Sequence, residues 1–157
     1  MPNASELKQQ LESKVTEIKQ IVSGVDEERA SQPPATGEWC VKEVLTHLGV
    51  DPLILSSFKQ IVEEDTPFID VVPGQSHFSE EQRARTVSAI LDEVETRYLD
   101  VAGLLGSLSP DQLQRKAHIP LFKQTPFGEY PTLEQWASGL INFHLADHVN
   151  QLRTLTQ

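Results

Sequence analysis

The sequence predicts an all-α protein, a four-helix bundle that occupies residues 1–157 as a single domain. Four long segments carry apolar residues at steps of three and four, the spacing that gives a helix one buried face. No segment shows the convincing alternation of apolar and polar residues that is typical of a half-buried strand. A chain of 157 residues can bury a core without disulfides or a structural metal. We expect long irregular loops after the second and third helices.

The first helix is expected from about Ser5 to Ala30, with Ser5 as its N-cap. Gly24 has a low helix propensity, so the last turns are expected to fray, and Pro33 with Pro34 ends the element. The apolar face contains Leu7, Leu11, Val15, Ile18, Val22 and Val25.

The second helix is expected to open within residues 38–48 and to continue to Val62. Pro52 interrupts it, because proline cannot donate the helical hydrogen bond to the carbonyl of Leu48. Either the helix kinks there, or a new helix starts with Asp51 as its cap. The interruption lies about one turn beyond His47, where a widened bundle would leave room for a ligand.

The third helix follows an irregular segment, residues 65–79, which contains two prolines and Gly74. Ser79 and Gln82 have the spacing of a capping box and predict the start of this helix. Its apolar face contains Val87, Ile90, Leu91, Val94, Tyr98, Val101 and Leu105.

A short helical turn is expected at residues 109–113, followed by a second irregular segment at 117–131. Thr132 and Gln135 then form the capping box of the last helix. The stripe of this helix contains Leu133, Trp136, Leu140, Ile141, Leu145, Leu152 and Leu155.

The composition excludes several classes of partner. The net charge is −10, from 23 acidic and 13 basic residues, and the basic residues form no cluster. Binding to nucleic acid depends on a basic surface that displaces counterions from phosphates, so we expect no nucleic-acid partner and no anionic membrane surface. No secretory signal and no apolar stretch of membrane-spanning length is visible, so a cytoplasmic protein is expected. The single cysteine excludes an intramolecular disulfide and a cysteine-based zinc site.

Three histidines form the most informative pattern in the chain. His144 and His148 are four residues apart, which places both imidazoles on one face of the last helix. His47, on the second helix, could complete a site with three nitrogen ligands and open positions for water or substrate. The alternative is that these are ordinary core or rim histidines without a metal, and the spacing alone does not decide between the two.

Two segments resemble the DinB-like superfamily. Residues 37–48, which contain Trp39, Glu43 and His47, resemble the Trp-Ser-x-x-Glu-x-x-x-His-Leu pattern at the start of that family's second helix. The last helix resembles the family's closing His-x-x-x-His-x-x-Gln segment, with Gln151 as its glutamine. The order of the helices and the chain length are also similar, so the resemblance covers nearly the whole chain.

The resemblance implies a DinB-like four-helix bundle, often a homodimer, with a divalent metal held by His47, His144 and His148. Nickel, zinc, manganese and iron all occur in the family. Some branches transfer low-molecular-weight thiols such as bacillithiol, mycothiol or glutathione, others isomerise maleylpyruvate, and others are described as metal-dependent hydrolases. We therefore expect a small-molecule substrate.

Two functions follow from one chemical step at such a site. A divalent ion held by neutral imidazoles lowers the pKa of a bound water or thiol, so the site suits either a hydrolase or a thiol S-transferase. The resemblance favours the thiol S-transferase. A non-catalytic bundle that binds a small molecule or a protein partner, with a vestigial site, is the remaining alternative.

Three further residues are candidates to orient the histidine ligands. Asp51 and Glu43 lie four residues after and before His47, and Gln151 lies three after His148. For the two acids the alternative is a solvated surface charge. Arg97 is expected to be an ordinary surface residue, with binding of an acidic ligand as its alternative.

Cys40 departs from the family pattern, which commonly has serine or threonine after the tryptophan. We expect it to be a half-buried small residue. The alternative is a thiol made more acidic by the helix dipole, with a role in redox sensing or as a nucleophile. Two other histidines, His77 and His118, lie in the proline-rich loops and could line a substrate pocket.

Overall fold

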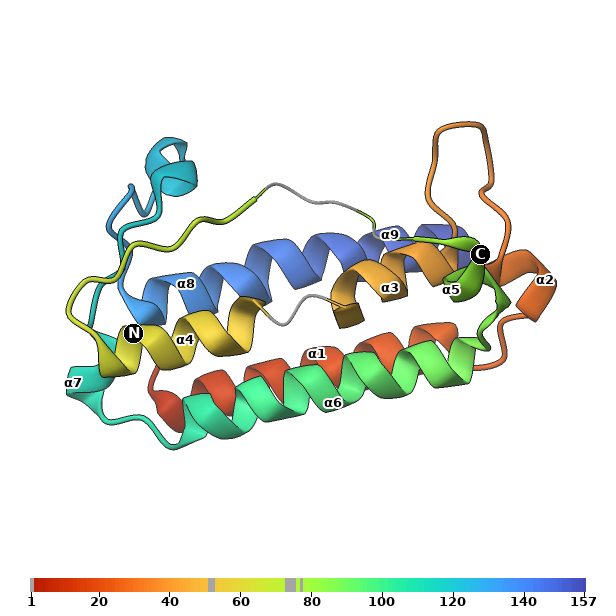
Figure 1. Cartoon of the computed structure of the whole chain (residues 1–157). Helices are drawn as coiled ribbons and strands as arrows, with labels where there is room; N and C mark the ends of the chain where they lie inside the picture. Colours follow the sequence, from red (N-terminus) through yellow and green to blue (C-terminus); the bar gives the residue numbers. More distant parts are fainter. Residues whose placement is uncertain (1, 51–52, 73–75, 77) are drawn as a thin grey trace.

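The computed structural model describes residues 2–50, 53–72, 76 and 78–157, and its long helices form a four-helix bundle (Figure 1). The long helical elements are α1 (Ala4–Val22), α3 (Val41–Val50), α4 (Leu53–Glu63), α6 (Val87–Gly106), α8 (Leu133–Gly139), η2 (Leu140–Leu145) and α9 (Ala146–Thr156). In Figure 1, α1 and α6 run side by side along one edge, and α3 packs on α6. The buried side chains of these helices form one continuous core, so the predicted all-α bundle is confirmed.

The short elements are α2 (Glu27–Ala30), α5 (Glu80–Ala84), α7 (Pro110–Leu113) and the 3₁₀ helix η1 (Pro120–Gln124). Among the described helices, none is both long enough and apolar enough to cross a membrane.

The first helix begins earlier than predicted. Asn3, and not Ser5, is the N-cap of α1: its side chain accepts a hydrogen bond from the Glu6 N–H at 2.9 Å, and the Glu6 carboxylate accepts one from the Asn3 N–H at 3.3 Å. This reciprocal arrangement satisfies two N–H groups that have no partner inside the helix.

The first helix also ends earlier than predicted. Helix α1 stops at Val22, and Gly24 adopts a positive φ of 78°, a conformation that glycine reaches without strain. The chain then turns, and Asp26 caps the separate helix α2. The predicted helix to Ala30 is therefore two helices, because the turn at Gly24 ends the first one.

The described part of the second predicted helix consists of α3, which ends at Val50, and α4, which begins at Leu53, so the interruption predicted at Pro52 lies outside the described residues. Asp51 also lies outside them, so the cap predicted for Asp51 stays a prediction. Gly49 allows α3 to approach α6 closely: a Cβ at this position would lie 3.3 Å from the backbone nitrogen of Val94.

The third long helix starts later than predicted. Ser79 does cap a helix, since its hydroxyl accepts from the Gln82 N–H at 3.2 Å, but that helix is the short α5. The extended backbone of Arg85 ends α5, and Thr86 caps α6 by accepting from the Ala89 N–H at 3.1 Å.

The predicted turn and the predicted last cap are both confirmed. Ser109 with Gln112 and Thr132 with Gln135 form complete capping boxes at the starts of α7 and α8. Two isolated β-bridges, Phe68 with His118 and Lys116 with Thr132, fasten the irregular segments to each other and to the start of α8.

The last helix contains a feature that the sequence pattern did not indicate. Residues Leu140–Leu145 form a π-helical segment between α8 and α9. Leu140, Ile141 and Leu145 in this segment remain buried, while Phe143 is 62% exposed. Segments of this type widen the helix by one residue per turn and frequently occur at functional sites.

An ion pair between the buried Lys42 and the exposed Glu27 connects four of the helices near the start of α3. The Lys42 side chain is only 4% exposed, and its ammonium lies 3.0 Å from the Glu27 carboxylate on α2. Lys42 also donates to the Arg83 carbonyl of α5 at 3.0 Å. The same Glu27 carboxylate accepts from the Val87 N–H at 3.0 Å and so occupies the N-terminus of α6. A lysine this deeply buried needs these partners, because an uncompensated buried charge is costly.

We predict that Glu27→Ala lowers the free energy of unfolding by about 1–3 kcal/mol, because it leaves the Lys42 ammonium short of a partner. Urea unfolding followed by circular dichroism measures this change. Glu28→Ala, which removes the neighbouring exposed acid, serves as the matched control and is expected to change stability little. Equal stability of the two variants would contradict the structural role of the pair.

Candidate metal centre

The three histidines of the sequence pattern meet at one place in the fold. His47 comes from α3, His144 from η2 and His148 from α9. One ring nitrogen from each lies within 4.8 Å of those of the other two. The ring centroids are 4.9 Å apart for His47 and His148 and 4.7 Å apart for His144 and His148. One imidazole from α3 and two from the last helix, where η2 continues into α9, therefore converge on one point.

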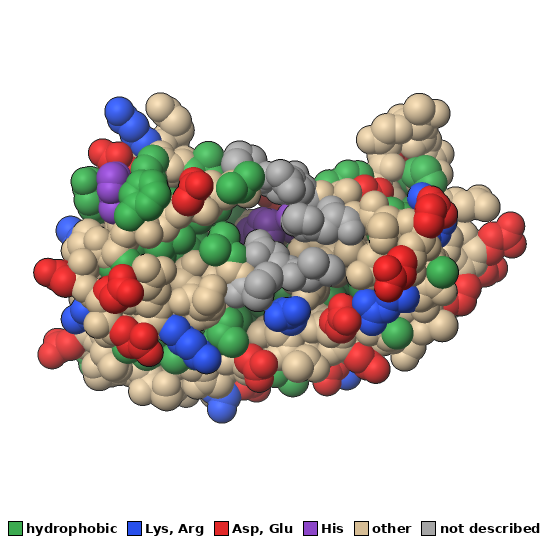
Figure 2. All heavy atoms as spheres, in the orientation of Figure 1, with side chains coloured by type: hydrophobic (Ala, Val, Ile, Leu, Met, Phe, Trp, Pro, Cys, Tyr) green, Lys and Arg blue, Asp and Glu red, His purple; other side chains and the backbone are tan. Residues whose placement is uncertain are grey.

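The π-helical segment presents one of these rings to solvent. His144 is exposed, whereas His47 and His148 are half-buried. The rings of His144 and His148 are nearly perpendicular, with an interplanar angle of 82°. Figure 2 shows histidine atoms visible from outside near the middle of the face in view. The cluster is thus half-buried at His47 and His148 and accessible to solvent at His144.

Gln151 determines which nitrogen of His148 faces the cluster. The Nδ1 of His148 lies 2.9 Å from the amide oxygen of Gln151. An amide oxygen only accepts hydrogen bonds, so Nδ1 carries the proton and the lone pair lies on Nε2. Burial lowers the pKa of His148, and the hydrogen bond that its Nδ1–H donates to Gln151 only partly opposes this shift. The imidazole is therefore neutral near pH 7, which is the form that binds metals.

Trp39, in the segment before α3, packs against two of the histidines. Its ring lies edge-on to His47 at 5.3 Å and parallel to His148 at 6.5 Å, with an interplanar angle of 5°. The indole contacts ligand candidates from two helices at once, and no spacing in the sequence indicates such a contact.

The other candidates for orienting the histidines are placed differently. Asp51 lies outside the described residues. The Glu43 carboxylate forms no hydrogen bond to an imidazole in the described part of the chain, and its charge acts instead on the thiol of Cys40. Asp147 is exposed, and its charge only weakly favours protonation of His148.

The loop histidines do not join the cluster in the described residues. His77 lies outside the described residues. His118 lies on the 117–131 segment, where its ring stacks on Tyr130 at 4.6 Å and its Nε2 lies 3.4 Å from the Glu129 carboxylate. Phe68 contacts the same ring edge-on at 5.4 Å. His118 therefore joins two loops and has partners of its own.

Cys40 is more deeply buried than predicted. It is 1% exposed and precedes the first residue of α3. Burial raises the pKa of its thiol, and the Glu43 charge raises it further, while backbone N–H groups of Glu43 and Lys42 only partly oppose the shift. The alternative of an acidic, accessible thiol is therefore wrong, because the effect of burial exceeds that of the helix start.

The donor set suits a divalent transition metal. Three neutral imidazoles are typical ligands of zinc, nickel, iron and manganese, and one accessible side leaves room for further ligands. The hydrogen bond from Nδ1 of His148 to Gln151 is the kind of outer contact that orients a ligating imidazole.

Comparison with known proteins supports the same architecture. The chain matches the DinB superfamily over residues 10–152. Among solved structures it is similar to YfiT from Bacillus subtilis, a probable metal-dependent hydrolase with an unusual four-helix bundle topology. The two chains are 24% identical with a TM-score of 0.78, and the match covers 97% of this chain and 85% of that chain. No curated protein matches the chain in sequence.

We predict that Cys40 in the folded protein reacts with a disulfide reagent at least about tenfold more slowly than in the unfolded chain, which requires a local opening cost of only about 1.4 kcal/mol. Since the pKa of the thiol is raised, the rate should also begin to rise at a higher pH than for a free cysteine. Stopped-flow absorbance with and without denaturant measures both effects. Rapid labelling of the folded protein at neutral pH would indicate an accessible thiolate instead.

Proposed function

This chain belongs to the DinB superfamily, and we propose that it is a metal-dependent enzyme whose three histidines hold a divalent ion. The observation that supports this proposal most directly is the convergence of His47, His144 and His148, with ligand atoms within 4.8 Å of one another. Zinc, nickel, manganese and iron are the candidate ions, and their identity follows availability as much as affinity.

Each residue of the cluster has a proposed role. His148 would bind through Nε2, because Gln151 occupies its Nδ1. Trp39 limits the rotation of the His47 and His148 rings. His144 lies at the accessible side, where a small-molecule substrate would enter. When bound there, a divalent ion lowers the pKa of a water or thiol nucleophile.

The finer proposal is the transfer of a low-molecular-weight thiol to an electrophilic substrate, which follows from the family resemblance. A specific observation supports hydrolysis as the second candidate: YfiT, which shares the fold, is a probable metal-dependent hydrolase. In either reaction Cys40 is not the nucleophile, since its thiol is buried. A homodimer in the cytoplasm remains part of the proposal.

We predict that the protein, expressed without a histidine tag, binds about one divalent ion per chain. Changing any one of His47, His144 or His148 to alanine is expected to abolish stoichiometric binding, because each supplies one of three ligands. Elemental mass spectrometry after gel filtration measures the metal content. His118→Ala is the matched control and should retain the metal, since its ring lies with Glu129 and Tyr130.

Two assays on the metal-loaded protein separate the candidate reactions. Metal-dependent loss of free thiol with bacillithiol or glutathione and an electrophile such as monochlorobimane supports thiol transfer. Metal-dependent cleavage of esters or amides without added thiol supports hydrolysis. A protein that binds no ion, even after incubation with zinc, nickel, manganese and iron, would contradict the enzyme proposal and favour a non-catalytic bundle.

We further predict that Gln151→Ala weakens metal binding by about 10–100-fold, because the imidazole of His148 loses the partner that orients it. Competition with a chromophoric chelator measures the dissociation constant. Gln151→Glu should preserve much of the affinity, since a carboxylate also accepts from Nδ1–H. Asn150→Ala, at the exposed neighbouring position, is the control. Unchanged affinity in Gln151→Ala would show that this hydrogen bond does not orient a ligand.

A further inference from the structure

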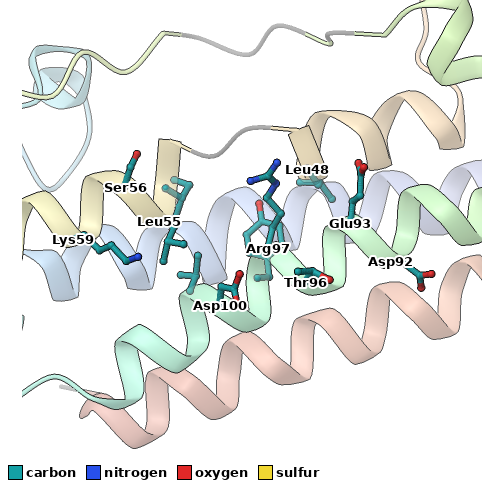
Figure 3. A pocket seen from close by; sticks show the side chains of 12 residues that line it. Leu48, Leu55, Ser56, Lys59, Asp92, Glu93, Thr96, Arg97 and Asp100 are labelled. Carbon is teal, nitrogen blue, oxygen red and sulfur yellow. The ribbon is translucent and has the colours of Figure 1, made fainter.

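A groove of about 580 Å³ lies between α4 and α6, next to the division between α3 and α4 (Figure 3). This volume falls within the range of small-molecule sites, about 300–1,000 Å³. The residues that line it do not include the three histidines of the metal centre. The groove is therefore a separate cavity, and the proposed function does not account for it.

The inner surface of the groove is mainly apolar. Leu48 from α3, Leu55 from α4, and Tyr98 and Val101 from α6 all line it. Three helices contribute because α4 packs on α6 less extensively than α3 does. Such a surface favours an apolar ligand body, which would be removed from water on binding.

Two cations extend into the same space from opposite helices: Lys59 from α4 and Arg97 from α6 (Figure 3). The Nε of Arg97 donates to the Gly49 carbonyl at 2.6 Å, which holds the guanidinium at the groove. In the described part of the chain, no carboxylate lies within ion-pair distance of either side chain. Other cations that reach α6 do have a carboxylate partner there: Lys19 of α1 pairs with Glu95, and Arg85 pairs with Glu93.

Three acidic residues line the groove in the described part of the chain, and none of them pairs with Lys59 or Arg97. Glu93 is already paired with Arg85 at 3.1 Å. Asp92 is exposed and points along α6, away from Lys59 and Arg97 (Figure 3). Among the described residues of the lining, Asp100 is the one remaining acid, and it extends from α6. The negative charge of Asp100 weakens the binding of an anion in the groove. Removing this charge should therefore strengthen anion binding, whereas removing the charge of Lys59 should weaken it.

We propose that this groove binds a small amphipathic anion, a molecule with an apolar body and one carboxylate, sulfonate or phosphate group. The apolar body lies on Leu48, Leu55 and Val101, and the anionic group lies between Lys59 and Arg97. The site is independent of the metal and extends beyond the proposed function of the histidine cluster.

Isothermal titration of the full chain with three ten-carbon probes tests the proposal: decanoate, decanol and decyltrimethylammonium, each below its aggregation concentration. The expected result is one decanoate per chain, weaker binding of decanol and the weakest binding of the ammonium. The His144→Ala variant is expected to bind decanoate as the wild type does, which distinguishes the groove from an anion bound at the metal.

Charge variants locate the site. Lys59→Gln is expected to weaken decanoate binding about two- to fivefold, and Asp100→Asn to strengthen it by a similar factor, as for partly exposed charges. Neither change should affect decanol. Lys123→Gln, which removes an exposed cation on η1, is the control for net charge. Arg97→Gln also removes the hydrogen bond to Gly49, so Lys59 and Asp100 provide the decisive pair.

Three results would overturn the proposal. The first is the absence of decanoate binding in a folded protein. The second is equal affinity for decanoate and decanol, which would mean that the cations play no part. The third is binding that Lys59→Gln and Asp100→Asn leave unchanged, which would place the anion elsewhere.

Discussion

The packing of α3 between α6 and α9 is the constraint on which both sites depend. Two consecutive residues of this helix serve different surfaces: His47 meets the histidines of the last helix, and Leu48 lines the groove at α6. Gly49 makes the close approach to α6 possible, and Arg97 of the same α6 donates a hydrogen bond to the Gly49 carbonyl. The ion pair of the buried Lys42 with Glu27 anchors the start of the same helix. The packing of α3 thus positions His47 for the histidine cluster and Leu48 for the groove.

The histidine cluster proposed to bind a metal is held by neighbouring side chains on one side and exposed on the other. His148 is held by Gln151 and by the parallel ring of Trp39, and burial keeps its imidazole neutral. His144 lies in the π-helical segment and is exposed. Orientation of ligands by outer contacts, together with an open side, is the arrangement expected of a catalytic rather than a purely structural metal site. Burial raises the pKa of the Cys40 thiol, so this residue is poorly suited to act as a nucleophile.

The chain as a whole is acidic, but the charge around each site depends on which lysines and arginines are paired with carboxylates. The net charge is −10, and in the described residues seven of the 13 lysines and arginines form an ion pair. Lys19 of α1 and Arg85, for example, pair with Glu95 and Glu93 of α6. Against this background, a place where two cations lack a carboxylate partner in the described structure is informative. Lys59 and Arg97 occupy such a place, above an apolar surface. Local pairing, rather than net charge, therefore determines where this protein can attract an anion.

The sequence alone predicted the features that depend on neighbours within one helical turn. Apolar periodicity predicted the helices of the bundle and the short turn at residues 109–113. Ser79 and Thr132 were correctly identified as caps, and the spacing of His144 and His148 placed both rings together. These features arise from contacts three or four residues apart and from hydrogen bonds between a side chain and the nearby backbone. Only the tertiary structure decided the rest: the π-helical segment, the contacts of Trp39, the pair of Lys42 with Glu27, and the groove. Each of these features joins residues from different helices or depends on how a helix packs. A pattern within one helix does not indicate which residues of another helix it will contact.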